Sequence, residues 1–266
     1  MPGPRYQSAL TTAMSAALVL ALLFANANAV AADLTSAPEE HPDIATLVKR
    51  IMEAQLDSRA RAKPYSVTRE YKVFGSNEDR PRTEVLAQVN FLPPNVKSYG
   101  IDQSTGGMGE KVVRRILDHE VDATRDPKLM MINGSNYDFN FTGEEVAGGL
   151  ACYKLAITPR RDRKDLLRAV IWVDKDSYRI VRIEGDPVKS PSFWVKDVHV
   201  VIEFAEVAGM WLQTETHAMA HLRFGGEYKI VSHDLNYDVA QTVAANTAPA
   251  RPRRRHSSAI MAVGVR

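Results

Sequence analysis

Residues 166–184, LLRAVIWVDKDSYRIVRIE, contain the pattern that decides the fold of this chain. Two apolar runs rich in β-branched residues flank the polar tetrapeptide 174–177, DKDS, whose side chains favour a tight turn. This hairpin pattern continues in both directions. From Asn136 to Val239 about seven strand-like runs follow one another, bounded by Gly, Pro, Asp or Asn, and none has a helical period. The stretch therefore predicts an antiparallel meander.

The expected strands of this meander cover residues 136–142, 150–158, 166–173, 178–184, 194–204, 211–224 and 227–239. Gly225-Gly226, between the last two, is the strongest two-residue hairpin signal in the chain. So many consecutive hairpins build one wide sheet, which has to curl and to be covered on one face. A curled and covered sheet favours an enclosed space that can hold an apolar ligand.

The chain before the meander predicts two amphipathic helices and three further strands. The first helix carries an apolar stripe at helical spacing, formed by Ile44, Leu47, Val48, Ile51, Met52 and Leu56. Pro64 ends it. A second helix is expected over Lys111–Ala123, with His119 and Glu120 solvated, and strands are expected at 65–74, 83–91 and 96–101. Arg69 is the one charged residue on the apolar face of the first of these strands.

The two ends of the chain differ from this pattern. Residues 1–32 read as a cleaved secretory signal, with Arg5, an apolar run of twelve residues at 13–24, and small residues that fit a cleavage site. A membrane anchor is the alternative, but a span needs about 20 apolar residues. Residues 242–266 are rich in Ala and Pro and then in Arg, which is typical of a disordered basic tail.

The positive net charge of the whole sequence comes mainly from this tail. The whole sequence has 34 basic and 32 acidic side chains. Without Arg5 and the five arginines of the tail, 28 basic side chains remain against 32 acidic ones, so residues 33–250 carry a net charge of −4. A mildly acidic folded part argues against nucleic-acid binding. The tail is expected either to be solvated or to touch an anionic membrane surface.

No group of residues predicts catalysis or a metal site. Cys152 is the single cysteine. It lies in an apolar strand-like run, which predicts a buried and inert thiol. His217 and His221 are expected on a strand, where residues four apart are about 13 Å from each other, too far to share one ion. Asp174 and Asp176 fit a turn better than acid–base chemistry. The chain contains no nucleophile elbow and no nucleotide-binding loop.

The order of several short phrases resembles the bacterial lipoprotein-carrier superfamily, the LolA/LolB-like proteins. The phrases run through Asn136–Phe139, Gly149 to Leu155, Ile171–Asp174, Ile180–Gly185, Ser190–Trp194 and Gly209–Leu212. They follow a signal peptide, an amphipathic helix, hairpin strands and a short helix, in the order of that group. The resemblance extends from Ile44 to Val239.

The resemblance implies an α+β, mostly β fold: a strongly curved antiparallel sheet, or incomplete barrel, covered by a few amphipathic helices. Residues 33–241 would form this LolA-like half-barrel domain. Carriers with this fold hold acyl chains in the apolar space between sheet and helices. No numbered position of this chain matches the lid arginine or the partner-docking hook of the best-studied carriers.

We therefore expect an exported, periplasmic carrier or binding protein for lipid or lipoprotein acyl chains, with no catalytic activity and no cofactor. Its partners would be a lipid or a lipidated protein, an envelope protein, and transiently a membrane. The predicted apolar wall consists of Phe193, Trp194, Val198, Val200, Ile202 and Phe204. The predicted lid consists of Ile44, Leu47, Ile51, Ile116 and Leu117.

Two other classes of function remain open from the residues alone. A sensor or protein-interaction module of the same fold would depend on a protein partner. An exported hydrolase would assemble its site from residues distant in sequence, and one polar substitution would abolish its activity.

Overall fold

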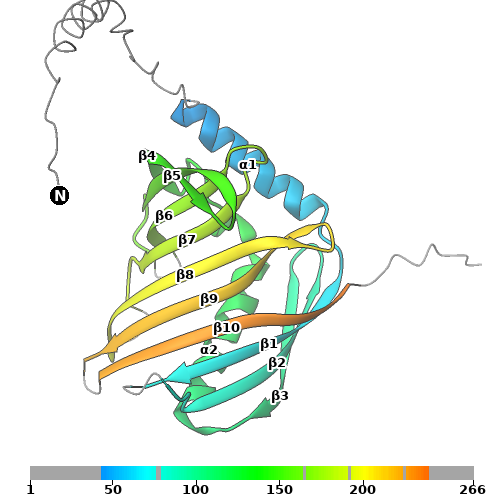
Figure 1. The fold of residues 1–266 in the computed structure, drawn as a ribbon, viewed down its shortest axis with the longest axis vertical. Coiled ribbons are helices and arrows are strands. Elements are labelled where there is room, and N and C mark those ends of the chain that lie inside the picture. The colour runs from blue at the N-terminus through cyan, green and yellow to red at the C-terminus, as the bar shows by residue number, and fades with distance from the viewer. Residues whose placement is uncertain (1–42, 76–78, 164–165, 191–192, 224–225, 240–266) are drawn as a thin grey trace, which may run out of the picture. The chain divides into compact units, whose positions relative to one another are not determined.

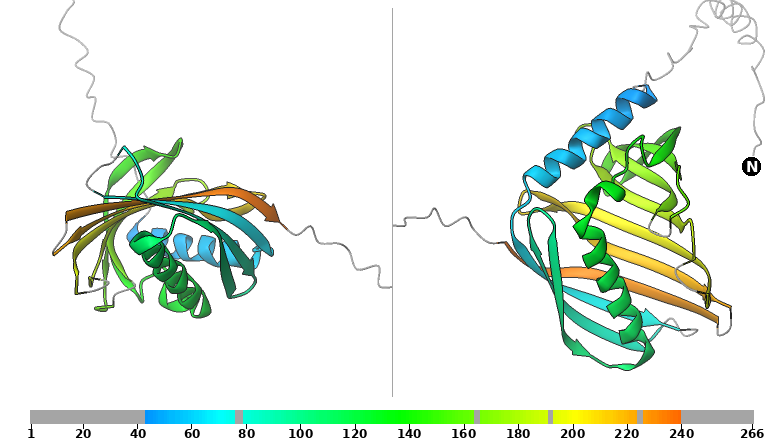
Figure 2. Two further views of the ribbon diagram at one scale, coloured as in Figure 1. Left: turned by 90° about the horizontal axis from the view of Figure 1, so that it is seen from below. Right: turned by 180° about the vertical axis from the view of Figure 1, so that it is seen from behind.

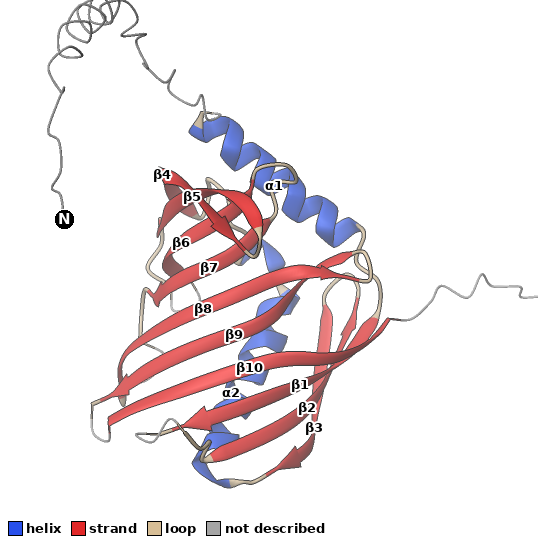
Figure 3. Ribbon diagram, viewed as in Figure 1, coloured by secondary structure: helices blue, strands red, loops and turns tan. Residues whose placement is uncertain are grey.

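Figure 1 shows the computed structural model of the chain, which describes residues 43–75, 79–163, 166–190, 193–223 and 226–239. The predicted signal peptide (1–32) and the predicted basic tail (242–266) lie outside the described residues. Two α-helices, α1 Ile44–Ala60 and α2 Gly107–Arg125, and a short 3₁₀ helix, η1 Pro127–Leu129, accompany the strands. Figure 3 distinguishes the helices from the strands.

The strands form one antiparallel sheet, whose order is β3-β2-β1-β10-β9-β8-β7-β6-β5-β4. Their bounds are β1 Tyr65–Phe74, β2 Thr83–Leu92, β3 Val96–Ser104, β4 Tyr137–Ala147, β5 Leu150–Pro159, β6 Leu167–Asp174, β7 Ile180–Pro187, β8 Val195–Val207, β9 Met210–Leu222 and β10 Gly226–Val239. The first strand, β1, lies in the interior of the sheet, and β2 and β3 continue from it to one edge. α2 then carries the chain to the other edge, and β4 to β10 return strand by strand until β10 pairs with β1.

The expected fold class is confirmed: the described residues are mostly β, with one open ten-stranded sheet and two α-helices among them. Two boundaries differ from expectation by several residues. β4 continues to Ala147 because Gly143, with φ of 136°, accommodates a register shift that would otherwise end the strand. α2 begins at Gly107 rather than at Lys111, since glycine is tolerated in a first turn whose N–H groups lack helical partners in any case.

Both helices lie on the concave side of the sheet, which curves around α2 (Figure 2). α1 begins directly after Asp43, whose carboxylate accepts a hydrogen bond from the Thr46 backbone N–H at 3.1 Å. This is the usual N-terminal cap of a helix. Two residues of α1, Leu47 and Ile51, are completely buried.

The concave side contains two separate hydrophobic cores. In the first core, Leu47 and Ile51 of α1 pack with residues of β4 to β7, namely Tyr137, Tyr153, Leu155, Ile157, Ala169, Ile171, Val173 and Ile180. In the second core, Val113 and Leu117 of α2 pack with residues of β1 and β2, namely Val67, Tyr71, Val73, Val85, Ala87 and Val89. Each helix therefore covers its own part of the sheet.

A third, smaller cluster lies on the outer face. Beyond the bend at Gly143, the tip of the β4–β5 hairpin curls over this face (Figure 1). Ala147 of the tip packs against Cys152, Trp172 and Val181, which are almost completely buried. The bend thus allows an apolar group to be buried on the face that is otherwise turned to solvent.

Candidate ligand-binding face

A strip of six residues lies on the concave face between the two cores, and we call it the concave strip. It consists of Val198, Val200 and Ile202 of β8 and Thr216, Ala218 and Ala220 of β9, which pair with one another across the two strands. Directly paired residues of neighbouring strands point to the same face. Ile202 pairs with Ile183, which packs against the first core. Ala218 pairs with Ile230, which packs against the second core.

The side chains of the concave strip are only partly buried. None of the six belongs to a buried core, although five of them are apolar. On the β9 side they are small, so they form a low floor between the two packed helices. Figure 2 shows that parts of β8 to β10 have no helix in front of them. The fold therefore leaves apolar surface available on its concave face.

The structure brings most of the predicted wall and lid residues to this side of the sheet. Val198, Val200 and Ile202 form the β8 half of the concave strip. Phe204 is partly buried and packs against the first core. The predicted lid residues divide between the helices: Ile44, Leu47 and Ile51 contact the first core, and Ile116 and Leu117 contact the second. Their contact with a ligand stays a prediction.

Phe193 and Trp194, unlike the other predicted wall residues, lie outside β8. Both lie in a turn before β8, which begins at Val195, so they do not follow the alternation of the strand. Their side chains are 72% and 62% exposed. The Trp194 carbonyl accepts a hydrogen bond from the Arg223 N–H, directly after β9. As for the other predicted wall residues, contact of Phe193 and Trp194 with a ligand stays a prediction.

A buried charge cluster attaches α2 to the sheet. Arg69 of β1 forms a bidentate ion pair with Asp234 of β10, and its Nη1 lies 2.9 Å from Oε1 of Glu120 on α2. Lys97 of β3 contacts the other Glu120 oxygen at 3.1 Å. The side chains of Arg69 and Asp234 are only 5% and 4% exposed. Hydrogen bonds to ionised partners of this geometry are stronger than neutral ones.

The charges of the cluster stabilise one another. Burial alone would raise the pKa of the Glu120 carboxyl, but the positive charges of Arg69 and Lys97 outweigh it, so this pKa lies below its ordinary value. Burial would likewise lower the pKa of Arg69, but the hydrogen bonds of Asp234 and the charge of Glu120 raise it instead. Burial raises the pKa of the neighbouring Tyr65 to about 12. The direction of both shifts favours the charged forms of Glu120 and Arg69.

The sequence had indicated Arg69 as the exception on an apolar face, but it predicted Glu120 to be solvated. That prediction was wrong: Glu120 points from α2 to Arg69 and Lys97. A charged residue in the middle of an apolar alternation was the signal for a buried partner, because an unpaired buried charge is very costly. The position of the partner on α2 depended on tertiary packing.

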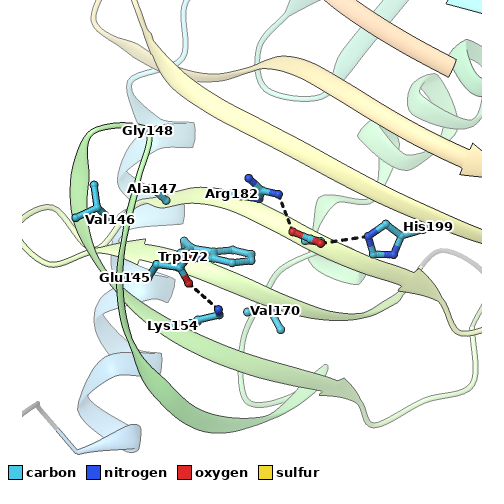
Figure 4. A pocket seen from close by; sticks show the side chains of 10 residues that line it. Glu145, Val146, Ala147, Gly148, Lys154, Val170, Trp172, Arg182 and His199 are labelled. Atoms are coloured by element: carbon cyan, nitrogen blue, oxygen red, sulfur yellow. Dashed lines mark hydrogen bonds and ion pairs between the residues drawn. The ribbon is translucent and has the colours of Figure 1, made fainter. Parts of the chain in front are cut away.

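A cavity of about 560 Å³ lies on the outer face, between the tip of the β4–β5 hairpin and strands β6 to β8 (Figure 4). Trp172 forms its floor, with Nζ of Lys154 and Cζ of Arg182 each 5.1 Å from its ring centroid. Both cations are paired: Lys154 with Glu145 at 2.6 Å and Arg182 with Glu184 at 2.7 Å. The Trp172 side chain is almost completely buried. The charged side chains in the wall of the cavity are thus paired with one another, beside the apolar surface of Trp172 and Val170.

His199 completes the polar wall of this cavity. Its two ring nitrogens face Asp186 at 2.8 Å and Glu184 at 3.3 Å. The hydrogen bond to Asp186, and then that to Glu184, raises the pKa of His199 above its ordinary value. The positive form of the imidazole is therefore favoured between the two carboxylates.

A second cavity, of about 480 Å³, lies beside the C-terminal half of α2. His119, Asp122 and Ala123 of α2 line one side of it. Asp162 of the β5–β6 connection and Lys189 of the β7–β8 connection line the other. The lining combines these polar side chains with Leu129 and Met130, and it brings Lys189 of the β7–β8 connection to the same cavity as α2.

Within the part of the chain that the structure describes, no group of three or more His, Cys, Asp or Glu side chains is arranged to hold a metal ion. Cys152 is buried, and burial raises the pKa of its thiol. Asp174 serves the turn: its Oδ2 accepts hydrogen bonds from the N–H of Ser177 at 2.8 Å and from the Ser177 hydroxyl at 2.5 Å. Neither helix of the described residues has the length and apolar character of a membrane span.

Comparison with family models and with curated proteins finds no match for this chain. Several solved structures are similar to it. A DUF1329 family protein from Desulfovibrio piger is 15% identical, with a TM-score of 0.41, over 74% of this chain and 95% of the other. An outer membrane lipoprotein-sorting protein domain from Vibrio parahaemolyticus is 12% identical, with a TM-score of 0.42, over 75% of this chain and 96% of the other. A LolA superfamily protein from Nitrosomonas europaea is 12% identical, with a TM-score of 0.37, over 73% of this chain and 94% of the other.

Proposed function

We propose that the protein is a non-catalytic carrier or binding protein for an apolar ligand, either a lipid or the acyl chains of a lipidated protein. In this proposal residues 1–32 direct its export and it acts in the periplasm. The concave strip is the single observation that carries the proposal. It is apolar, partly exposed, and bordered by helices on an otherwise packed face.

The physical basis is the burial of methylene groups. Each buried methylene contributes about 0.8 kcal/mol, so a chain of several methylenes binds to an apolar floor without polar recognition. The small side chains of Ala218 and Ala220 leave height above β9, and Val198, Val200 and Ile202 provide the contact surface. Ligand-binding sites are generally lined in this way, with mostly apolar side chains.

α2 would act as the cover of the ligand. It is held on one side by the second core and by the buried charge cluster around Arg69. Its other side is turned towards the open part of the sheet (Figure 2). An acyl chain on the concave strip would bury the partly exposed residues of β8 and β9 that neither core covers.

The test fills the concave strip by substitution. In Ala218→Trp the indole would occupy the space above β9, whereas Ala205→Trp adds the same group to an exposed position of β8. We expect the affinity for a fluorescent fatty acid to fall about tenfold or more in Ala218→Trp, as for the loss of two methylene contacts. Ala205→Trp should bind like the wild type.

Organic extraction and mass spectrometry of the purified full-length chain would identify the native ligand. A protein that carries no lipid and does not bind the fluorescent probe would contradict the proposal. If instead a protein partner is retained and its binding survives Ala218→Trp, the chain is an interaction module rather than a carrier.

A further inference from the structure

The turn between β7 and β8 presents two aromatic side chains to solvent. Phe193 is 72% exposed and Trp194 is 62% exposed. Their ring centroids are 5.5 Å apart in an edge-to-face arrangement. Among the described residues they are the only aromatic side chains that are this exposed. Exposing two large apolar rings beside one another is costly in water, so the pair requires an explanation beyond packing.

The backbone at Phe193, Trp194 and Val195 is held by hydrogen bonds. The backbone N–H of Arg223 donates to the Trp194 carbonyl at 2.9 Å, and Nε of Arg223 donates to the Phe193 carbonyl at 2.8 Å. The hydroxyl of Ser190 donates to the Val195 carbonyl at 2.6 Å. The carbonyls of Phe193 and Trp194 are thus both held by Arg223, which directly follows β9. The two exposed rings project from a backbone that is hydrogen-bonded at both residues.

One cationic side chain contacts the aromatic pair, and two lysines flank the pair in the sequence. The Arg223 guanidinium lies 5.5 Å from the Phe193 ring centroid. Lys196 follows Trp194 by two residues and its side chain is 70% exposed, and Lys189 precedes the pair with a side chain that is 52% exposed. Asp162 pairs with Lys189 at 3.1 Å and Asp197 with Lys196 at 4.0 Å, but such exposed ion pairs are weak. The lysines are therefore available to other anions.

We propose that this turn docks the protein on the surface of a lipid bilayer. Trp and Phe rings partition to the interface between headgroups and acyl chains, and Lys and Arg beside them reach the phosphates. A protein partner fits less well, because a specific protein interface buries about 800 Å² per partner and this apolar group is limited to two rings amid charged residues. Two exposed aromatic rings with cationic residues beside them in the sequence fit the surface of a lipid bilayer better.

The position of the turn connects it with the proposed carrier function. Val198, the first residue of the concave strip, lies three residues after Val195, which is about 10 Å along a strand. Docking at Phe193 and Trp194 would thus bring the end of the concave strip close to the membrane. This link rests on the proposed function, whereas the docking itself does not.

The first experiment measures binding of the full-length chain to lipid vesicles by sedimentation. We expect Phe193→Ala/Trp194→Ala to lower binding to phosphatidylcholine vesicles about fivefold or more, because it removes both interfacial rings. The control is Leu92→Ala/Val96→Ala, which removes two side chains that are 55% and 53% exposed at the β2–β3 turn. This control should bind like the wild type. Equal losses in both double variants, or no binding by the wild type, would overturn the proposal.

Anionic vesicles separate the turn from the basic tail, whose arginines also attract phosphates. On vesicles with phosphatidylglycerol, the loss in Phe193→Ala/Trp194→Ala should persist, and Lys196→Glu should weaken binding further only there. Wild-type binding by the aromatic double variant on both vesicle types would assign membrane contact to the tail and refute docking by the turn.

A fluorescence experiment locates the inserted side chain. Brominated lipids should quench the emission of the wild type, and Trp194→Phe should keep vesicle binding while losing most of the quenching. Trp172 is almost completely buried and lies on the outer face, so it provides an internal reference. Undiminished quenching in Trp194→Phe would show that another part of the protein contacts the bilayer.

Measuring probe binding and vesicle binding separately on the same variants keeps the two proposals distinguishable. Phe193→Ala/Trp194→Ala should bind a soluble fluorescent fatty acid like the wild type, and Ala218→Trp should keep vesicle binding while losing the probe. Loss of the probe alone therefore concerns the concave strip, and loss of vesicle binding alone concerns the turn.

Discussion

The two helices on the concave face are held to the sheet by different forces. α1 buries Leu47 and Ile51 in the first core, and Gln55 exchanges two hydrogen bonds with the backbone of Ile132 at 2.8 and 3.2 Å. α2 also packs on apolar residues, but it carries Glu120 into the buried charge cluster with Arg69. The buried contacts of α1 are apolar or neutral, whereas those of α2 include buried charges. The two attachments should therefore differ in their dependence on pH.

Arg69→Ala should have the largest effect. It leaves Asp234 and Glu120 without their main counter-charge in a buried position, which costs about 3–5 kcal/mol of unfolding free energy. Urea denaturation at neutral pH measures this loss. Arg69→Lys is the control, since it keeps the charge but not the bidentate geometry, and it should lose less. An Arg69→Ala protein as stable as the wild type would show that the cluster does not hold α2.

Leu47→Ala tests the apolar attachment of α1. The side chain is completely buried in the first core, so its truncation should cost about 2–5 kcal/mol. Because no ionisable group takes part, the loss should be the same at every pH at which the protein is folded. The solvent-exposed Leu56 of the same helix is the control, and Leu56→Ala should change the unfolding free energy by less than about 0.5 kcal/mol.

Acidification should weaken α2 more than α1. The pKa of Glu120 is lower in the folded than in the unfolded protein, so its contribution to stability is present above the unfolded value of about 4.3 and is lost as the pH falls through the folded value. The difference in unfolding free energy between the wild type and Glu120→Gln should shrink as the pH decreases below about 4. The difference between the wild type and Leu47→Ala should stay constant over the same range.

Asp43→Ala should have the smallest effect of the series. It removes the cap at the start of α1, which costs about 1 kcal/mol. Asp43→Asn keeps a capping oxygen and should recover most of this loss. A loss in Asp43→Ala as large as that in Leu47→Ala would mean that the cap, rather than the apolar stripe, holds α1 in place.

The strands and helices were largely predictable because their signals are local. Alternating residues with Gly, Pro, Asp or Asn at the boundaries predicted the seven strands of the meander, and the apolar stripe from Ile44 predicted α1. Pairing of β1 with β10 could not be predicted, since no local pattern specifies which strands meet across the length of the chain. The curvature and the two separate cores depend on that pairing.

The candidate site was predictable only in part. Alternation correctly placed Val198, Val200 and Ile202 on one face of β8. It does not extend to Trp194, because alternation applies only within a strand and β8 begins at Val195. The small residues of β9 that form the floor of the concave strip were not singled out, since alanine carries almost no positional signal. Which helix covers which strands is a property of tertiary packing.

The pairing of β1 with β10 has a consequence for how the chain folds. Arg69 and Asp234 meet across 165 positions of the sequence, because the first and the last strand of the chain are neighbours in the interior of the sheet. Contacts of such long range are slow to form, because a large loop has to be closed before they contribute. Until β10 has emerged, β1 has no partner on one side and Arg69 has no Asp234. A chain that crosses a membrane unfolded, starting with its N-terminus, would therefore complete its sheet only after the last strand has arrived on the far side.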